Sequence, residues 1–221
     1  MLESTIDTAA ADWLVSSAST TSGPGLRRLV PARFEAILRV FHPFGNGAEP
    51  VSWETQASER DIDLQWNTPS ASLRDGILVP PGRQLDVEQV KVLAETLPVG
   101  RADGPAAGSI YIGAWVGWGD YRVFDGLPTY RGPRECFLFR GTMEDLVAEA
   151  MADARGVSEG RPPLRPYQWW PEDRSWYGLS DIDLDSTLLA GNRALLESVA
   201  DRVESRFLPD DPDPDLAPLS G

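Results

Sequence analysis

Three residue types that carry much of protein chemistry are almost absent from this sequence. Its 221 residues include one cysteine, Cys136, one histidine, His42, and one lysine, Lys91. A disulfide within the chain and a zinc site built on two histidines are therefore excluded. Because disulfide-stabilised proteins accumulate in oxidising compartments, the single cysteine favours a reducing one.

Long apolar runs are missing as well. The longest, Ile110–Trp118, is interrupted by glycines. It is far shorter than the ~20 residues that cross a bilayer as a helix. The beginning of the chain lacks the basic and apolar segments of a secretory signal peptide. These absences predict a cytoplasmic protein without a membrane partner.

Positive charge is in deficit. The chain carries 34 acidic and 20 basic side chains, which gives a net charge of −14. An acidic surface repels the phosphates of nucleic acids, and no glycine-rich phosphate loop of the GxxxxGK(S/T) or GxGxxG type occurs. We therefore expect no nucleic-acid partner and no cofactor. The charge fits a basic protein partner, and it also fits a role in solubility alone.

Apolar periodicity and capping residues predict the elements of the fold. The expected helices are 9–14, 31–41, 86–97, 142–155 and 192–207, and the expected strands are 110–118, 121–124, 135–140 and 176–184. Helices and strands are mixed without the regular alternation of a parallel sheet. This order predicts a single α+β domain, with a mixed or antiparallel sheet and helices packed against it.

Composition divides the chain into three segments. Residues 1–25 combine a short helix with a flexible linker rich in Ser, Thr and Gly, residues 26–208 form the α+β domain, and residues 209–221 are an acidic tail. Because such a tail has too little apolar surface to bury, it is expected to be disordered.

The most distinctive local pattern is an acidic triplet, Asp181, Asp183 and Asp185. Alternate residues of a strand share a face, so the three carboxylates would line up opposite apolar neighbours. A solvated or arginine-paired face explains them most simply, because three like charges in a row need a counter-charge. A divalent-metal or catalytic site and a partner-binding edge are the alternatives.

The stretch from Asp183 to Leu188 also resembles the first motif of haloacid-dehalogenase-like phosphatases. The resemblance implies a nucleophilic aspartate followed by an aspartate that acts as general acid and base. However, only 34 residues follow Thr187, and none of them is a lysine. A complete phosphatase domain is therefore excluded.

Tryptophans form the second pattern. Trp115 and Trp118 lie among glycines, and Trp169 and Trp170 follow later in the chain. Aromatic rings beside glycines can form a stacking surface for a sugar or a nucleobase. The same spacing arises more often when neighbouring elements pack side chains into the gaps that glycines leave. Cys136 lies among apolar residues and is expected to be buried, and no catalytic residue is predicted.

Three sequence blocks together resemble a family of uncharacterised actinobacterial proteins. The blocks are Val30–Pro43, Ala114–Gly119 and Trp169–Trp176, and the last of them runs into Asp181-Ile-Asp183, as it does in that family. The resemblance covers most of residues 26–207. It implies no particular activity.

A weaker resemblance links the beginning of the domain to SUKH-type immunity and regulatory proteins. It rests on Leu29-Val-Pro31, Phe34, Leu38 and the turn Asn46-Gly47. The Leu-Pro pair of that family is interrupted here by Val30, and Phe34 stands where those proteins have tyrosine. The resemblance implies a helix over this segment, an α+β fold and the binding of a toxin.

Two functions therefore stay open. The first is a non-catalytic, acidic interaction module of the immunity type that binds a basic protein. The second is a metal-dependent enzyme or a binding protein for a sugar or nucleotide. In the second, Asp181, Asp183 and Asp185 would act as metal ligands or contact the substrate, together with the nearby tryptophans.

Overall fold

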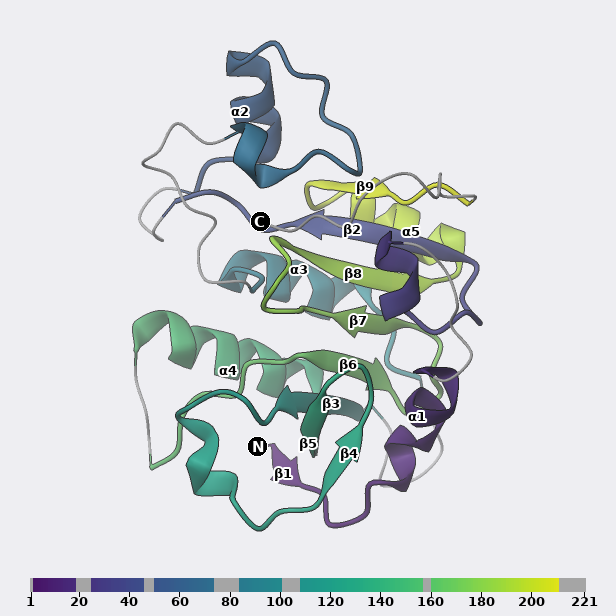
Figure 1. Cartoon of the computed structure of the whole chain (residues 1–221), viewed down its shortest axis with the longest axis vertical. Helices are drawn as coiled ribbons and strands as arrows, with labels where there is room; N and C mark the ends of the chain where they lie inside the picture. Colours follow the sequence, from purple (N-terminus) through teal and green to yellow (C-terminus); the bar gives the residue numbers. More distant parts are fainter. Residues whose placement is uncertain are drawn as a thin grey trace.

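An antiparallel sheet of nine strands is the centre of the computed structural model, which describes residues 2–18, 25–45, 50–73, 84–100, 108–156 and 160–210 (Figure 1). From edge to edge the strand order is β1-β5-β3-β6-β7-β8-β2-β9, and β4 also pairs with β5. The strands are β1 (Glu3–Ser4), β2 (Ala36–Phe41), β3 (Ile110–Trp115), β4 (Thr129–Arg131), β5 (Glu135–Gly141), β6 (Gln168–Pro171), β7 (Tyr177–Leu179), β8 (Ser186–Gly191) and β9 (Ser205–Phe207).

Five α-helices and four short 3-10 helices accompany the sheet in the described residues. The α-helices are α1 (Asp12–Ala18), α2 (Trp53–Glu59), α3 (Val87–Thr96), α4 (Met143–Arg155) and α5 (Arg193–Ala200). The 3-10 helices are η1 (Ala9–Ala11), η2 (Gly25–Leu29), η3 (Ser70–Leu73) and η4 (Tyr121–Phe124). Within this described part of the chain, no helix is long and apolar enough to span a membrane.

The sheet separates two apolar cores. α3, α4 and α5 cover one face, where Leu93, Leu146 and Val199 are buried in the same cluster as the strands (Figure 1). η1, α1 and η2 contribute to the core on the opposite face, with Leu14 and Leu26 buried there. Helices thus pack against one antiparallel sheet, and the predicted α+β class is confirmed.

A capping box forms at the start of α3 and another at the start of α4. The side chain of Asp86 accepts a hydrogen bond from the backbone N–H of Gln89 (2.7 Å), and the backbone N–H of Asp86 donates to the Gln89 side chain (3.2 Å). Thr142 and Asp145 form the same reciprocal pair at the start of α4. Both helices were predicted at these positions, because the signal that starts each one lies within four consecutive residues.

The predicted helix over residues 31–41 is wrong, because this segment contains strand β2. All six residues of β2 are buried, since the strand pairs with β8 on one side and β9 on the other. A strand that is buried on both faces reads as a nearly continuous apolar run, which periodicity does not separate from a buried helix. His42 therefore directly follows a strand.

Three further predictions of elements need correction. Residues 121–124 form the 3-10 helix η4 and not a strand. The last helix ends at Ala200, and the chain then enters β9, which was expected to be helical. The strand expected at 176–184 ends at Leu179, so residues 181–185 lie in the turn between β7 and β8. Strands β1, β4, β6 and β8 and helix α2 were not predicted.

Two of the expected segments fall largely on residues whose structure is not described. These are residues 19–24 of the linker and residues 211–221 of the tail. On the described side of these gaps, β1 pairs with β5. Arg27 donates through Nε (3.0 Å) and Nη2 (2.8 Å) to the carbonyl oxygen of Pro209.

Residues 50–73 form a smaller unit that extends beyond the β9 edge of the sheet, and we call it the lobe (Figure 1). The lobe contains α2 and η3. It has its own apolar cluster, in which lobe residues pack against two residues from the end of β2 and the segment after it. The cluster consists of Trp53, Ala57, Leu64 and Leu73 from the lobe with Phe41 and Phe44.

Candidate functional site

The acidic triplet lies at the same end of the sheet as Trp115 and Trp118, two of the four tryptophans that the sequence analysis singled out. β3 ends at Trp115, which pairs with Cys136 near the start of β5. β7 ends at Leu179, which pairs with Leu188 near the start of β8. The turns 116–128, 132–134 and 180–185 follow or precede these strands at one common end, which we call the loop end of the sheet.

Asp181 and Asp183 share one arginine of the loop end. Arg134 binds the Asp181 carboxylate with two hydrogen bonds, Nε to Oδ2 (3.0 Å) and Nη2 to Oδ1 (2.6 Å). Its Nη2 also donates to Oδ2 of Asp183 (2.5 Å). The Asp183 backbone N–H donates to Oδ1 of Asp181 (2.9 Å) and closes the turn. Arg134 therefore ties the β7–β8 turn to the β4–β5 turn.

These contacts keep the Asp181 carboxylate charged although it is largely buried. Burial acts to raise the pKa of Asp181, but hydrogen bonds from Arg134 and from the Asp183 amide outweigh it and hold the pKa below its ordinary value. The hydrogen bond to Asp181 in turn raises the pKa of Arg134. The two groups form a permanently charged pair at neutral pH.

Asp185 belongs to a different ion pair. Its Oδ1 accepts a hydrogen bond from Nη2 of Arg39 (2.6 Å), a residue of β2 that is fully buried. Arg39 also donates through Nε to the Ser186 hydroxyl (2.9 Å) and through Nη1 to the carbonyl oxygens of Trp66 and Thr68 in the lobe. A buried guanidinium is tolerated because its donors are satisfied by these partners.

The three aspartates consequently do not share one cation. The Asp181 and Asp183 carboxylates meet at Arg134, while the Asp185 carboxylate is held by Arg39. Across the residues that the structure describes, no group of three or more His, Cys, Asp or Glu side chains is arranged to hold a metal ion. The arginine-paired face that the sequence favoured is present, but on a turn and not on a strand.

The marked tryptophans divide between the site and the cores. The Trp115 ring lies against Arg134, with 4.8 Å between Cζ and the ring centroid, and Trp118 lies against Arg165 at 4.7 Å. Trp169 and Trp170 are fully buried, in the cores on opposite faces of the sheet. Since a guanidinium covers one face of the Trp115 ring, that face is not open for a sugar or base.

Arg165, in the segment between α4 and β6, repeats the arrangement of Arg134. Its Nη1 lies 3.0 Å from Oδ2 of Asp120, and its Nη2 lies 3.0 Å from Oδ1 of Asp153. Each of these arginines therefore binds two carboxylates while its guanidinium lies against a tryptophan. Such units hold loops in place through charge, hydrogen bonds and ring contact together.

Sequence reasoning missed these arginines, although it required a counter-charge for the aspartates. Arg134 lies 47 positions from Asp181, and Arg39 lies 146 positions from Asp185. Such pairs are set by the order of strands in the sheet, which the sequence pattern did not reveal. Arg39 was also hidden inside a segment that was expected to be helical.

His42 and Cys136 are buried in different parts of the protein. Nε2 of His42 lies 2.9 Å from the Thr187 hydroxyl, and burial lowers the pKa of His42 to about 3. Burial raises the pKa of the Cys136 thiol far above its ordinary value. At neutral pH both side chains are therefore uncharged and enclosed, and the expected burial of Cys136 is confirmed.

Glycines in the strands make room for aromatic side chains. A Cβ atom at Gly113 would lie 2.0 Å from the Tyr130 hydroxyl oxygen, and a Cβ atom at Gly178 would lie 2.4 Å from the Trp169 indole. The space beside these glycines is thus filled by rings of the same protein.

Comparison of the chain with protein-family models, with curated proteins and with solved structures finds no match. The resemblance to the actinobacterial family stays a prediction. The SUKH-like opening implied a helix that includes Leu38, and the structure has strand β2 at that position. The function must therefore be argued from the site itself.

Proposed function

We propose that this protein is a non-catalytic, acidic interaction module that binds a basic protein partner in the cytoplasm, in the manner of an immunity protein. The observation that carries the proposal is the unequal exposure of the three aspartates on the β7–β8 turn. The side chains of Asp181 and Asp185 are 9% and 18% exposed, whereas that of Asp183 is 72% exposed on the same turn. The turn therefore offers one carboxylate in a fixed position.

Electrostatics supports a basic partner. The net charge of −14 attracts a positively charged protein over long range and accelerates the encounter at low salt. Arg134 binds only the Oδ2 oxygen of Asp183, so an arginine or lysine of the partner can approach the same carboxylate from the solvent side. Because Arg134 fixes the turn, this contact costs little ordering of the protein.

The metal or small-ligand function finds less support at this turn. Its three carboxylates are divided between two arginines, and Arg134 covers the ring of Trp115. That alternative predicts that magnesium, calcium, a sugar or a nucleotide raises the melting temperature. A rise that the Asp183→Asn variant abolishes would favour it over the interaction module.

Affinity capture at two salt concentrations tests the proposal. The tagged protein and its Asp183→Asn variant are exposed to extract of the source organism, and the retained proteins are identified by mass spectrometry. We expect a basic protein that the parent retains at low salt and releases at high salt, and that the variant retains several-fold less. Its affinity for the parent is then measured with the purified partner.

A matched control separates a defined site from general charge. Glu144→Gln also removes one exposed negative charge, but at the start of α4. The start of α4 follows the last residue of β5, at the opposite end of that strand from the loop end. We expect this variant to bind like the parent. Equal losses in the two variants, or no basic protein retained at either salt concentration, would contradict the proposal.

A further inference from the structure

The 3-10 helix η4 presents an acidic and an apolar side chain together at the loop end of the sheet. Side chains three residues apart share one side of a 3-10 helix. Tyr121 and Phe124 form the buried side of η4. Asp120, the residue before η4, and Val123 lie together on another side and are both exposed, Val123 to 59%. Since single exposed apolar side chains are common, what matters is how this pair is held and what lies beside it.

Buried aromatic side chains fix η4 in place. The Tyr121 hydroxyl donates to the carbonyl oxygen of Pro163 (3.2 Å) and accepts a hydrogen bond from the backbone N–H of Arg165 (2.5 Å). The Phe124 ring packs edge to face against Phe139 of β5, with 5.2 Å between the ring centroids. The exposed side of η4 is therefore preorganised, which lowers the entropy that is lost when a partner binds.

A row of side chains in contact joins η4 to the β7–β8 turn. The row consists, in order, of Arg134, Trp115, Trp118 and Arg165. Each guanidinium carbon lies 4.8 or 4.7 Å from the centroid of its indole, and the two indoles meet edge to face with 6.1 Å between their centroids. These three distances, laid end to end, put the two guanidinium carbons no more than about 16 Å apart. An extended peptide covers that span with about five residues.

Each end of the row carries an excess of negative charge and one incompletely used carboxylate. Arg134 and Arg165 each bind two carboxylates, so that negative charge exceeds positive charge at either end. Among the described residues, the exposed carboxylates of Asp183 and Asp120 are each bound through Oδ2 alone. The Oδ1 oxygen of each can therefore accept a hydrogen bond from a cationic side chain of a partner.

We propose that η4 is a second anchor of the partner-binding surface, and that the partner is a basic segment with two cationic side chains and an apolar one. The cations bind Asp183 and Asp120, and the apolar side chain covers Val123. The inference rests on the proposed function, whose site it extends from one carboxylate to two. Tryptophan and arginine side chains between the anchors are typical of the residues that dominate binding at protein interfaces. The required spacing selects against basic proteins that lack it.

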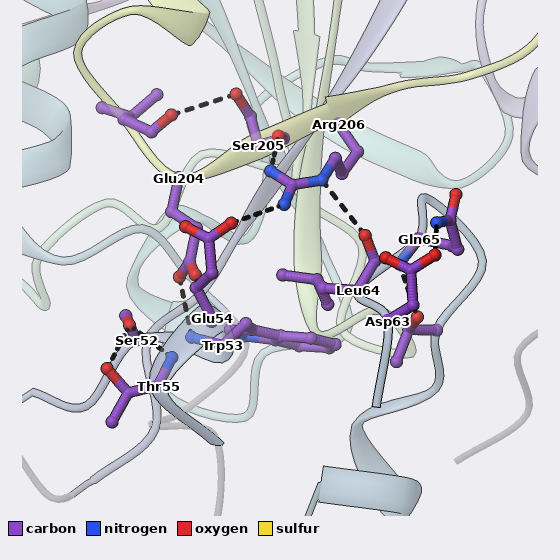
Figure 2. A network of polar contacts seen from close by, with 12 residues as sticks. Ser52, Trp53, Glu54, Thr55, Asp63, Leu64, Gln65, Glu204, Ser205 and Arg206 are labelled. Carbon is purple, nitrogen blue, oxygen red and sulfur yellow. Dashed lines mark hydrogen bonds and ion pairs between the residues drawn. The ribbon is translucent and has the colours of Figure 1, made fainter. Parts of the chain in front are cut away.

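The lobe carries an arginine-paired carboxylate that lacks an apolar neighbour of this kind. Nη2 of Arg206 donates to Oε1 of Glu54 (2.8 Å), whose side chain is 68% exposed. Nε of Arg206 donates to the carbonyl oxygen of Leu64 (3.2 Å), so that this arginine attaches the lobe to β9, as Figure 2 shows. No large apolar side chain of the lobe, residues 50–73, is exposed. Glu54 therefore provides a matched control, an exposed carboxylate held by an arginine but without a second anchor.

Titration of the isotope-labelled full chain with a synthetic peptide, followed by NMR, tests the inference. The probe is a capped peptide with two arginines separated by four residues, two of which are leucine, so that the arginines are about 17 Å apart when it is extended. We expect the amide signals of residues 120–125 and 180–185 to shift and those of the lobe to stay. Asp183→Asn, Asp120→Asn and Val123→Ser should each weaken binding about three- to fivefold, because each removes one contact. Glu54→Gln should change it less than about twofold, because salt screens a distant charge.

Changes in the peptide give a second measurement that does not depend on how the protein variants fold. Replacing either arginine by glutamine, or both leucines by serine, should weaken binding to the parent protein by a similar factor. Failure of the peptide to bind, or parent-like affinity of both the Asp120→Asn and the Val123→Ser variant, would overturn the inference.

The proposed function fails separately, when no basic protein is captured from the extract. A captured partner provides the comparison between the two. If its binding depends on Asp183 but on neither Asp120 nor Val123, the proposed function stands and the second anchor is wrong.

Discussion

At the scale of single residues, arginine organises this protein. Arg39, Arg134 and Arg165 each bind a carboxylate that lies 45 or more positions away in the sequence, and each guanidinium lies against a tryptophan ring. A guanidinium suits this role because its donors form a planar fork and its face stacks on aromatic rings. Lysine, which occurs once in the chain, offers neither property.

Arg39 is the residue whose substitution should lower the free energy of unfolding most. Arg39→Met removes the counter-charge of the partly buried Asp185 and leaves the Trp66 and Thr68 carbonyl oxygens without their donor. We expect the free energy of unfolding in urea to fall by about 3–5 kcal/mol. Arg202→Met, which breaks the exposed pair with Glu95, should cost less than about 1 kcal/mol. Equal effects of the two substitutions would contradict this assignment.

At the scale of elements, signals contained within a few residues were readable from the sequence and long-range ones were not. The capping boxes at Asp86 and Thr142 predicted the starts of α3 and α4. Strand β2 was mistaken for a helix because its neighbours, β8 and β9, come about 150 residues later. The acidic triplet was recognised, but its arginine partners depend on the same distant pairings and could not be named.

Gly178 of β7 packs against the Trp169 ring of β6, and this contact gives a prediction at the scale of elements. Gly178→Ala would bring a Cβ atom to 2.4 Å from the rigid indole of Trp169. We expect a loss of about 1–3 kcal/mol in the free energy of unfolding, because the ring must leave its rotamer or the strand must shift. Gly119→Ala, which meets no atom within 4 Å, should change it by less than about 0.5 kcal/mol. Denaturant unfolding of both variants measures the two changes, and equal changes would contradict the prediction.

At the scale of the whole molecule, His42 should shape the response to acid. Burial lowers its pKa from 6.5 to about 3, so that between these values the unfolded chain binds a proton that the folded protein excludes. The free energy of unfolding should therefore fall as the pH falls from about 6.5 towards about 3, with a slope approaching about 1.4 kcal/mol per pH unit.

Urea unfolding between pH 7.5 and 4.5 measures this slope. In the His42→Gln variant the contribution is absent, so its stability should decline less steeply than that of the parent. The carboxylates contribute to both proteins and cancel in the difference between the two curves. Parallel curves would mean that His42 takes up no proton on unfolding in this range.

The position of β2 in the sheet also dictates an order of events during synthesis. β2 occupies residues 36–41, yet both of its neighbours, β8 and β9, lie after residue 185. A ribosome that has completed β3, β5 and β6 has therefore produced one half of the sheet, while an apolar strand made earlier still has no neighbour. Until β8 emerges from the ribosome, Ala36–Phe41 is an unpaired apolar segment that a nascent-chain chaperone would have to cover.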